Sequence, residues 1–410
     1  MTSKAQQAAE QAAREAYGRL LSTLCQSTRD VAAAEDALGD AFARALAVWP
    51  TDGVPEAPDA WLLTTARRRV IDQARRRTVA ERHADEAAQW LQNAGPDDAV
   101  DGHSASTSQK GDARLDLMLA CAHPDIDAAV HAPLMLQTVL GLPVRQIAAA
   151  FALSPAALGQ RLARAKRRMK DLDLSLEPAD VIDADALSVL LNALYAAFAT
   201  GWNDAVGVRD LRHGLANEAL WLARVVVDRC PDAPEALGLL ALMLFAQSRR
   251  AARRDAAGRF VPLADQDRSL WDTAMMREAE AVLGVAARGG RMGRFQIEAA
   301  IQARHARPPV DADDIALLYE GLVRLAPSRA CLIARAAALA EARGVAVGLS
   351  ALAQLDPASV DRDASYWSVL GHLKSRAGLP DDARLAWRRA VGLAADPAIR
   401  AYLKERIDAL

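Results

Sequence analysis

Residues 144–170 read VRQIAAAFALSPAALGQRLARAKRRMK, the pattern of two short helices joined by a turn. Val144–Phe151 is the first helix and Ala152–Leu153 the turn, after which Ser154 is a suitable N-cap and Pro155 a suitable first helical residue. The second helix has an apolar seam that we expect to pack on the first: Leu158, Leu162, Ala165 and Met169. Outward or on its flanks it presents small and basic or amide side chains that suit a major groove: Ala156, Gly159, Gln160, Arg161, Ala163, Arg164, Lys166, Arg167 and Arg168. The stretch predicts a DNA-reading helix-turn-helix.

Helical spacing continues through nearly all of the 410-residue chain. Apolar residues recur three and four apart, and no stretch of alternating Val, Ile and Thr indicates a strand. Hydrophobic residues make up 52% of the chain and aromatic residues only 5%, which favours closely packed helices built from Ala and Leu. We therefore predict an all-α fold, and at about 150 residues per domain the length predicts two to three domains.

The chain is nearly neutral, with 50 Lys and Arg against 52 Asp and Glu, but its charge is uneven. A second basic cluster, WLLTTARRRVIDQARRR, runs from Trp61 to Arg77 and contains one acid, Asp72. Its apolar residues form a stripe along one helical face: Leu62, Leu63, Ala66, Val70 and Ala74. Such runs are usually solvated faces, but a helix with this many like charges repels itself unless a polyanion is present. We expect a nucleic-acid surface.

An acidic helix precedes this cluster. AEDALGDAFARALAVWP, residues 34–50, carries Glu35, Asp36 and Asp40. We expect its apolar stripe to be Ala37, Leu38, Ala41, Phe42, Ala45 and Leu46. It can be a core helix with one solvent-exposed face, or a helix that docks on a basic protein surface.

Composition divides the chain into blocks. Residues 5–82 and 113–174 are compact helical blocks, and residues 83–112 are Gly- and Ser-rich and predict a flexible linker. Residues 181–410 are helical and carry a weak repeat of tetratricopeptide (TPR) type. Its clearer copy consists of Trp367, Leu370, Gly371, Ala383, Trp387 and Ala390. A looser copy consists of Ala219, Ala223, Val226, Pro231, Leu237, Leu240, Ala241 and Leu244. An irregular helical bundle is the alternative.

Other features exclude whole classes of function. The cysteines Cys25, Cys121, Cys230 and Cys331 share no CxxC or CxxH spacing, so we expect reduced thiols in a cytoplasm and no metal site. The first residues are polar and charged, so we expect no signal peptide, and the charge-free run 186–203 fits a buried helix better than a membrane span. No phosphate loop, HExxH or GxSxG motif is present, so we expect neither an enzyme nor a cofactor.

Two of these blocks resemble a known family. AEDALGDAFARAL, a short loop and WLLTTARRRVIDQARRR resemble region 2 of bacterial extracytoplasmic-function sigma factors, which are RNA polymerase sigma factors of the sigma-70 type. RQIAAAFALSPAALGQRLARAKRRMK resembles their region 4. The match covers about residues 10–174 and implies a region 2 domain over 5–82, a linker and a region 4 domain over 113–174.

The resemblance implies roles for named residues. Docking on the clamp of the largest subunit of core RNA polymerase would fall to Glu35, Asp36, Asp40 and Phe42. Capture of the −10 element would fall to Trp61, Arg67, Arg68, Arg75 and Arg76. The −35 element would be read by Ala156, Gln160, Arg161, Arg164, Arg167 and Arg168, with region 4 at the polymerase flap. The partners are thus core polymerase and promoter DNA, with no membrane, cofactor or metal.

The long extension strengthens the resemblance. One subfamily carries a TPR-like C-terminal domain whose sequences resemble RRDAAGRFVPLADQDRSLWD, residues 253–272. The residues that carry this likeness, and a possible regulatory contact, are Asp255, Gly258, Leu263, Asp265, Gln266, Asp267, Arg268 and Trp271. We read DQDR as an acidic helix start. The subfamily implies regulation in cis without a dedicated anti-sigma factor; an inter-helix loop that packs Trp271 is the plainer reading.

Two other functions compete. A helix-turn-helix regulator with a TPR sensor would bind DNA without polymerase, but it would not need both the acidic helix and a second basic helix. An adaptor using a TPR groove would leave the acid-free recognition helix unexplained.

Overall fold

The computed structural model describes residues 8, 9, 12, 16–72, 113–151, 153–173, 182–202 and 209–410, without the side chains of 149, 150, 200 and 209–215. The predicted linker 83–112 lies outside these residues. The chain forms two compact units, residues 1–197 and 198–410. Within the described part, regular structure is helical, apart from one isolated antiparallel bridge between Arg254 and Phe260. Over this part the all-α prediction is confirmed.

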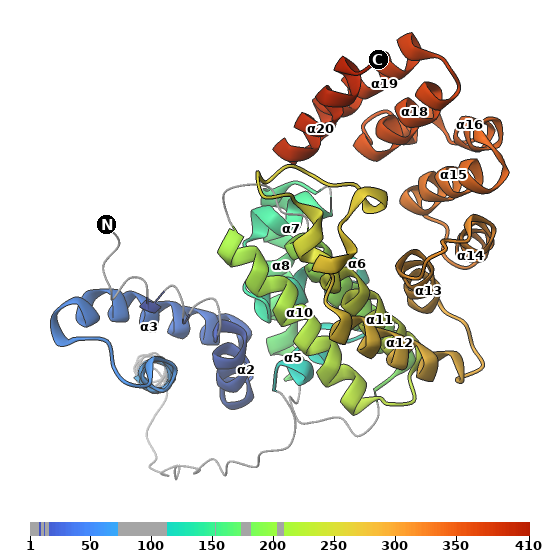
Figure 1. The fold of residues 1–410 in the computed structure, drawn as a ribbon. Coiled ribbons are helices and arrows are strands. Elements are labelled where there is room, and N and C mark those ends of the chain that lie inside the picture. Colours follow the sequence, from blue (N-terminus) through green and yellow to red (C-terminus); the bar gives the residue numbers. More distant parts are fainter. Residues whose placement is uncertain are drawn as a thin grey trace, which may run out of the picture. The chain divides into compact units, whose positions relative to one another are not determined.

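The first unit contains the two blocks that precede the extension (Figure 1). Besides a helix over residues 58–72, its helices are α2 (Tyr17–Thr28), α3 (Val31–Asp52), α5 (Ala113–Cys121), α6 (Ala128–Thr138), α7 (Val144–Ala150), α8 (Pro155–Asp171) and most of α9 (Ala184–Trp202). A tight turn joins α2 to α3: Arg29 is left-handed, with φ 50°, and its N–H donates to Cys25 O. Asp30 then caps α3 by accepting from the Ala33 N–H.

The buried face of α3 differs from the expected stripe. Ala37, Leu38, Ala41 and Ala45 are buried as predicted, but Leu46 is 48% exposed and Phe42 is half-buried. The stripe instead extends from Val31 at one end to Trp49 at the other. The reason is the 3.6-residue period: Trp49 follows Ala45 by four positions and fills the place assigned to Leu46.

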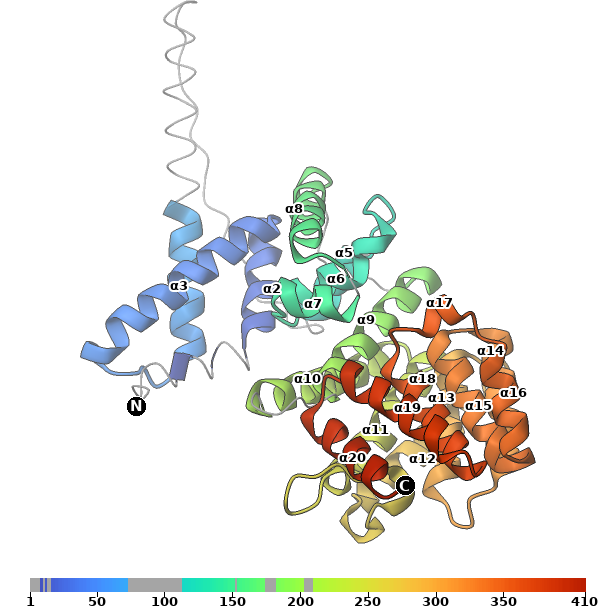
Figure 2. The ribbon, with the colours of Figure 1, turned by 90° about the horizontal axis from the view of Figure 1, so that it is seen from above.

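Helices α5 to α8 gather into one group, which Figure 2 shows from above. α8 packs on α6 and α7, and the expected seam of Leu158, Leu162, Ala165 and Met169 is buried. The turn between α7 and α8 is held by the Leu153 N–H, which donates to Ala148 O at 2.8 Å. Ser154 is at the N-cap position of α8, but its side chain accepts no hydrogen bond there.

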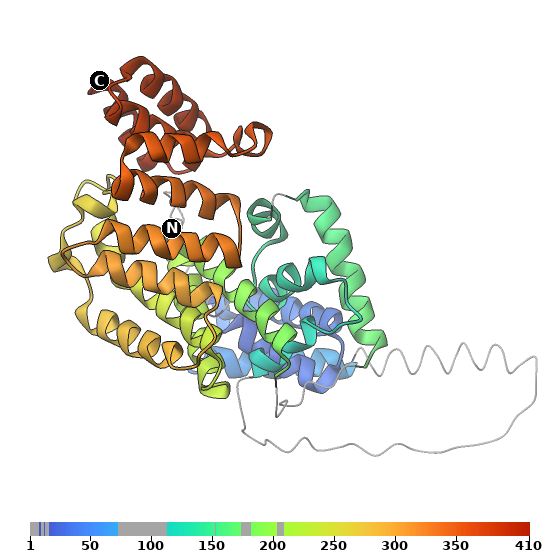
Figure 3. The same ribbon diagram turned by 90° about the vertical axis from the view of Figure 1, so that its right-hand side faces the viewer.

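The second unit is a succession of helices, visible as stacked orange and red layers in Figure 3. They are α10 (Arg209–Arg229), α11 (Pro234–Ser248), α12 (Thr273–Ala287), α13 (Arg294–Ala306), α14 (Ala312–Leu325), α15 (Arg329–Arg343), α16 (Val345–Ala353), α17 (Pro357–Val360), α18 (Ala364–Arg376), α19 (Pro380–Leu393) and α20 (Pro397–Asp408). Three short 3₁₀ turns, η1 (Arg250–Arg253), η2 (Leu263–Asp265) and η3 (Arg268–Leu270), lie between α11 and α12. α11 is buried along its length and packs on α10, α12 and α13.

Both predicted repeat segments lie on neighbouring helices. In the clearer copy, Gly371 of α18 faces Trp387 of α19 so closely that a Cβ on Gly371 would lie 2.4 Å from Trp387 Cδ1. The buried Trp387 donates from Nε1 to Ser368 O at 3.2 Å. The looser copy lies on α10 and α11, where Ala219, Ala223 and Val226 are buried. Small residues let each helix pair approach closely.

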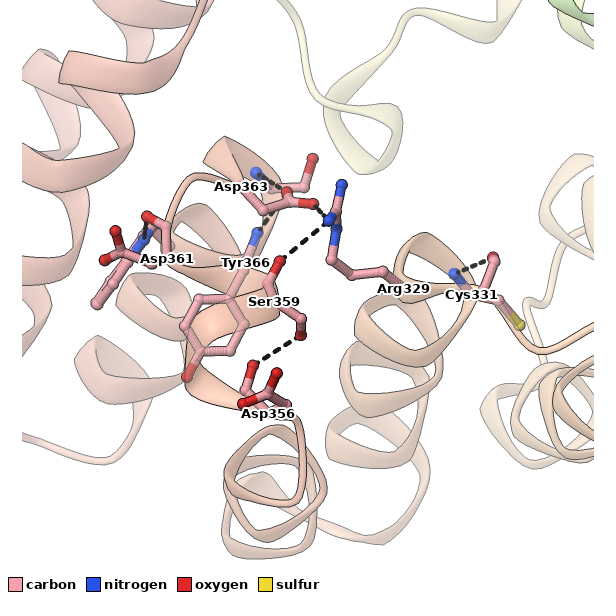
Figure 4. A network of polar contacts seen from close by, with 10 residues as sticks. Arg329, Cys331, Asp356, Ser359, Asp361, Asp363 and Tyr366 are labelled. Atoms are coloured by element: carbon pink, nitrogen blue, oxygen red, sulfur yellow. Dashed lines mark hydrogen bonds and ion pairs between the residues drawn. The ribbon is translucent and has the colours of Figure 1, made fainter. Parts of the chain in front are cut away.

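A polar network fixes the junction of α15, α17 and α18 (Figure 4). Arg329 donates to Asp363 Oδ2 at 2.7 Å and to Ser359 O at 3.0 Å. The other carboxylate oxygen of Asp363 caps α18 by accepting from the Ser365 and Tyr366 N–H groups. The Asp363 side chain thus caps the start of α18 and ties this helix to α15.

Candidate nucleic-acid interface

The helix over residues 58–72 carries the first part of the arginine cluster. Leu62 and Ala66 are buried, so the expected stripe turns inward, while Arg67 and Arg68 are exposed. Arg69 instead pairs with Asp40 of α3, Nε to Oδ2 at 2.6 Å. Arg75 and Arg76, expected beside them, lie outside the described residues.

Trp61 sits at the start of this helix and is half-buried. Its ring meets the buried Trp49 edge to face, with centroids 5.5 Å apart and planes at 66°. This edge contact orients Trp61 and covers part of its ring. A second contact, Arg19 with Asp59 at 2.5 Å, joins the helix to α2.

The three acids expected on α3 have different surroundings. Asp40 pairs with Arg69. Glu35 is half-buried, and both of its carboxylate oxygens accept from Lys166 Nζ of α8, at 2.6 and 2.7 Å. Asp36 is exposed, and the described part of the chain gives it no ion-pair partner. Of the three, Asp36 is the one open to a partner.

The outer face of α8 is basic. All the side chains assigned to DNA reading on this helix are exposed: Ala156, Gln160, Arg161, Arg164, Arg167 and Arg168. Arg168 pairs with Asp125 at 3.2 Å, and both side chains are about half exposed. Lys166, expected on a flank of this face, is a correction: it is 8% exposed, because Glu35 draws its ammonium group inward.

A hollow of about 200 Å³ lies beside α8, between this helix and the start of α6. Arg161, Arg164 and Arg168 line it from α8, and Asp125 and Asp127 line it from the loop before α6. Asp125 compensates part of the Arg168 charge at this hollow, because the two side chains form an ion pair.

The motif in the extension forms a loop between α11 and α12, not an acidic helix start. Asp255 closes a small hairpin by accepting from the Ala257 and Arg259 N–H groups and from Arg259 Nε. Hydrogen bonds from Arg259, backbone first, lower the pKa of Asp255. Gly258 has φ 78°, a left-handed conformation that favours glycine. Helix α12 begins only at Thr273, capped by Asp272.

The second half of the motif also makes internal contacts. Asp267 caps η3 by accepting from the Ser269 N–H, and hydrogen bonds from Ser269 lower its pKa. Gln266 donates to Val261 O, and Arg268 donates to Ala306 O and His305 O. Asp265 is exposed. The loop therefore organises the helices around it.

Trp271 is buried, and two arginines lie over its ring. It is 5% exposed, with the guanidinium carbons of Arg268 and Arg249 at 5.1 and 5.9 Å from its ring centroid. Burial, and then Arg253, lower the pKa of Arg249 to about 10. Arg253 also stacks over Trp202, at 4.2 Å from the ring, and donates to Trp202 O.

Two family models and one known protein match this chain. A family model described as "Sigma-70 region 2" matches residues 13–79, the part that holds α2, α3 and the arginine helix. A second, described as "Family of unknown function (DUF6596)", matches residues 186–287. An uncharacterized protein of Rhizobium meliloti (strain 1021) is 35% identical over 401 residues, which covers 95% of this chain and 93% of the relative.

The chain belongs to the same family as this Rhizobium meliloti protein. It carries a sigma-70 region 2 domain, as expected from the acidic and arginine-rich helices, and the DUF6596 region follows it along the chain. No solved structure matches the chain.

Other residues at these surfaces were missed from the sequence. Lys170 of α8 pairs with Asp30 at the start of α3, and no local pattern connects residues so far apart. Arg249 did have a signal, because it opens a run of arginines directly after the apolar α11. Over the part of the chain that the structure covers, no cluster of His, Cys, Asp and Glu could hold a metal ion. No helix there is long and apolar enough to cross a membrane.

Proposed function

We propose that this protein is a sigma factor of extracytoplasmic-function type, which binds core RNA polymerase and directs promoter recognition, DNA melting and transcription initiation. The observation that carries the proposal is the acidic and arginine-rich helix pair within the matched region 2. A sigma-70 region 2 by itself points to a role in transcription initiation. The assignments below are finer and are proposals.

Docking falls to α3. Asp36 is exposed for a first contact with a basic surface of the polymerase clamp, with Glu35, Asp40 and Phe42 beside it on the helix. Opposite charges steer such an encounter and fix its register.

Melted −10 DNA is held by the arginine helix. Arg67 and Arg68 are exposed for phosphates, and Arg75 and Arg76 continue the cluster. Trp61 offers the open part of its ring to an unstacked base. Stacking combined with phosphate neutralisation suits single-stranded DNA.

Duplex −35 DNA is read by α8, which serves as the recognition helix of a region 4 domain. Its small residue Ala156 permits close approach to the groove, and Gln160 reaches base edges. Arg161, Arg164, Arg167 and Arg168 serve the phosphates. The exposed basic face and buried seam of α8 support this role.

Residues 181–410 act as a TPR-like regulatory domain in cis, in place of a dedicated anti-sigma factor. The helix pairs of the second unit and the DUF6596 match over residues 186–287 support a domain distinct from the DNA-binding blocks. Truncation after Leu174 that leaves transcription unchanged in cells would refute regulation in cis.

Gel filtration with bacterial core RNA polymerase tests the docking role. The full chain is expected to co-elute, and Asp36→Arg to weaken binding by about tenfold or more, because it brings a like charge to a basic surface. Asp228→Arg, an exposed charge reversal at the end of α10, is the matched control and is expected to co-elute normally. Duplex-DNA binding without polymerase binding would instead indicate the helix-turn-helix regulator.

A further inference from the structure

Sigma region 2 packs directly against the α5–α8 group within the first unit. α2 contacts α5, and α3 contacts α8. The approach is closest at Gly18 of α2, where a Cβ would lie 1.9 Å from the carbonyl oxygen of Val139, at the end of α6. No side chain fits there, so glycine is required for this contact.

The same contact buries two thiols from opposite sides. Cys25 of α2 and Cys121 of α5 are both fully buried. Burial raises the pKa of both, that of Cys121 to about 12, and each is affected by the other or by Glu35. Their reactivity toward alkylating reagents therefore reports whether region 2 and the α5–α8 group are in contact.

Two ion pairs line the α3–α8 part of the contact, and both have the lysine on α8. Lys166 Nζ lies 2.6 Å from Glu35 Oε2, with side chains 9% and 21% exposed. Lys170 Nζ lies 2.9 Å from Asp30 Oδ2, whose side chain is 14% exposed. The two lysines come from α8 and the two carboxylates from the start of α3, so α8 meets α3 as a basic helix meeting an acidic one.

We propose that in the free protein Lys166 holds Glu35 in place of a basic residue of the polymerase, so that docking of α3 on polymerase must release α8 from region 2. This rests on the proposed function, because it assumes that Glu35 lies in the docking surface. Asp36, which is exposed, makes the first contact, and Glu35 exchanges Lys166 for its polymerase partner afterwards. Region 2 and the α8 helix are thereby separated only on the enzyme.

Zero-length cross-linking tests the pairing in the unmodified full chain. A water-soluble carbodiimide removes water from a carboxylate and an amine in contact, becomes a urea and leaves an amide between Glu35 and Lys166. Mass spectrometry of the free protein is expected to find this linkage, and saturating core polymerase is expected to reduce it severalfold. A linkage that persists unchanged on the bound enzyme would overturn the proposal, as would its absence from the free protein.

A matched pair of glycine substitutions tests the closed state, in which region 2 and the α5–α8 group are in contact. Gly18→Ala places a methyl group against Val139 O, whereas Gly39→Ala on α3 meets nothing within 4 Å. We expect alkylation of Cys25 and Cys121 to accelerate about tenfold in Gly18→Ala, the factor given by a closure weakened by ~1.4 kcal/mol. Gly39→Ala is expected to react like the wild type, and Cys230 and Cys331 of the second unit to be unaffected. Equal rates of Cys25 and Cys121 in Gly18→Ala and the wild type would overturn the closed state.

The proposed function and the proposed release of α8 are refuted by different outcomes. If polymerase does not bind but the cross-link and slow thiols are found, the proposed function is wrong while the contact between region 2 and α8 stands. If polymerase binds and also leaves Cys25 and Cys121 as slow as before, the proposed function survives and the release of α8 is refuted.

Discussion

Replacing Arg164 by alanine offers a quantitative test of the α8 surface. Arg164 is exposed, and among the described residues it has no carboxylate within ion-pair distance. Arg168, four positions along the same helix, already pairs with Asp125 at 3.2 Å. Alanine is a strong helix former, so neither substitution should unfold α8. The two variants thus differ mainly in whether the lost charge was already compensated.

The magnitude follows from counterion release. Each phosphate contact contributes about 0.9 to the slope of log K against log salt concentration. At ~0.1 M salt, one contact is therefore worth about 0.9 log units, or roughly eightfold in affinity. We expect Arg164→Ala to lose this full amount and Arg168→Ala less, because Asp125 must be displaced before Arg168 can reach a phosphate.

Fluorescence anisotropy with a labelled duplex of mixed sequence, repeated over a salt series, measures both quantities. The phosphate contribution does not depend on base sequence, so the promoter need not be known. Arg388→Ala, an exposed helical arginine in the second unit, is the control and should leave the slope unchanged. A slope for Arg164→Ala equal to that of the wild type would refute the assignment of α8 to DNA. A larger effect for Arg168→Ala than for Arg164→Ala would refute the reasoning about Asp125.

The second unit yields three further predictions. Gly371→Ala should destabilise it by about 1–3 kcal/mol in urea unfolding, because the packed Trp387 cannot yield, while Gly392→Ala, with open space around it, should not lower stability. Asp272→Ala should cost about 1 kcal/mol in the same assay through loss of the α12 cap. Burial, and then two guanidinium groups, lower the pKa of His305 below 6.5, so the folded state disfavours its protonation and stability should fall as pH drops below that value; a His305→Gln variant that keeps the same pH dependence would contradict this.

Local patterns predicted the helices and most of their buried faces. On α8 the seam of Leu158, Leu162, Ala165 and Met169 follows from spacing alone, because each residue repeats the helical period. The prediction that Leu46 is buried was wrong, because two stripes on α3 share that period. Only packing against Trp61 selects the stripe that ends in Trp49. Hydrophobic periodicity therefore locates the buried face of a helix only to within one residue position.

Contacts between distant segments were beyond sequence patterns. Lys166 looked like a flank residue of a DNA-binding helix, because residues 155–170 contain no acid. Its partner Glu35 precedes it by 131 positions. The DQDR motif was likewise read as a helix start from its charge, whereas its Asp267 caps a 3₁₀ turn and the helix begins after Trp271.

The hairpin around Asp255 changes how the second unit should unfold. Arg254 pairs with Asp396 at 2.6 Å, and Phe260 meets Tyr402 edge to face with centroids 5.6 Å apart. These contacts join the loop after α11 to α20, the last helix, across 142 positions of sequence. A stack of repeats that contact only their neighbours can fray from its end one repeat at a time. Here the last helix is joined to the loop after α11, so α20 cannot detach without breaking the contacts of this loop. We therefore expect the second unit to unfold as one cooperative block.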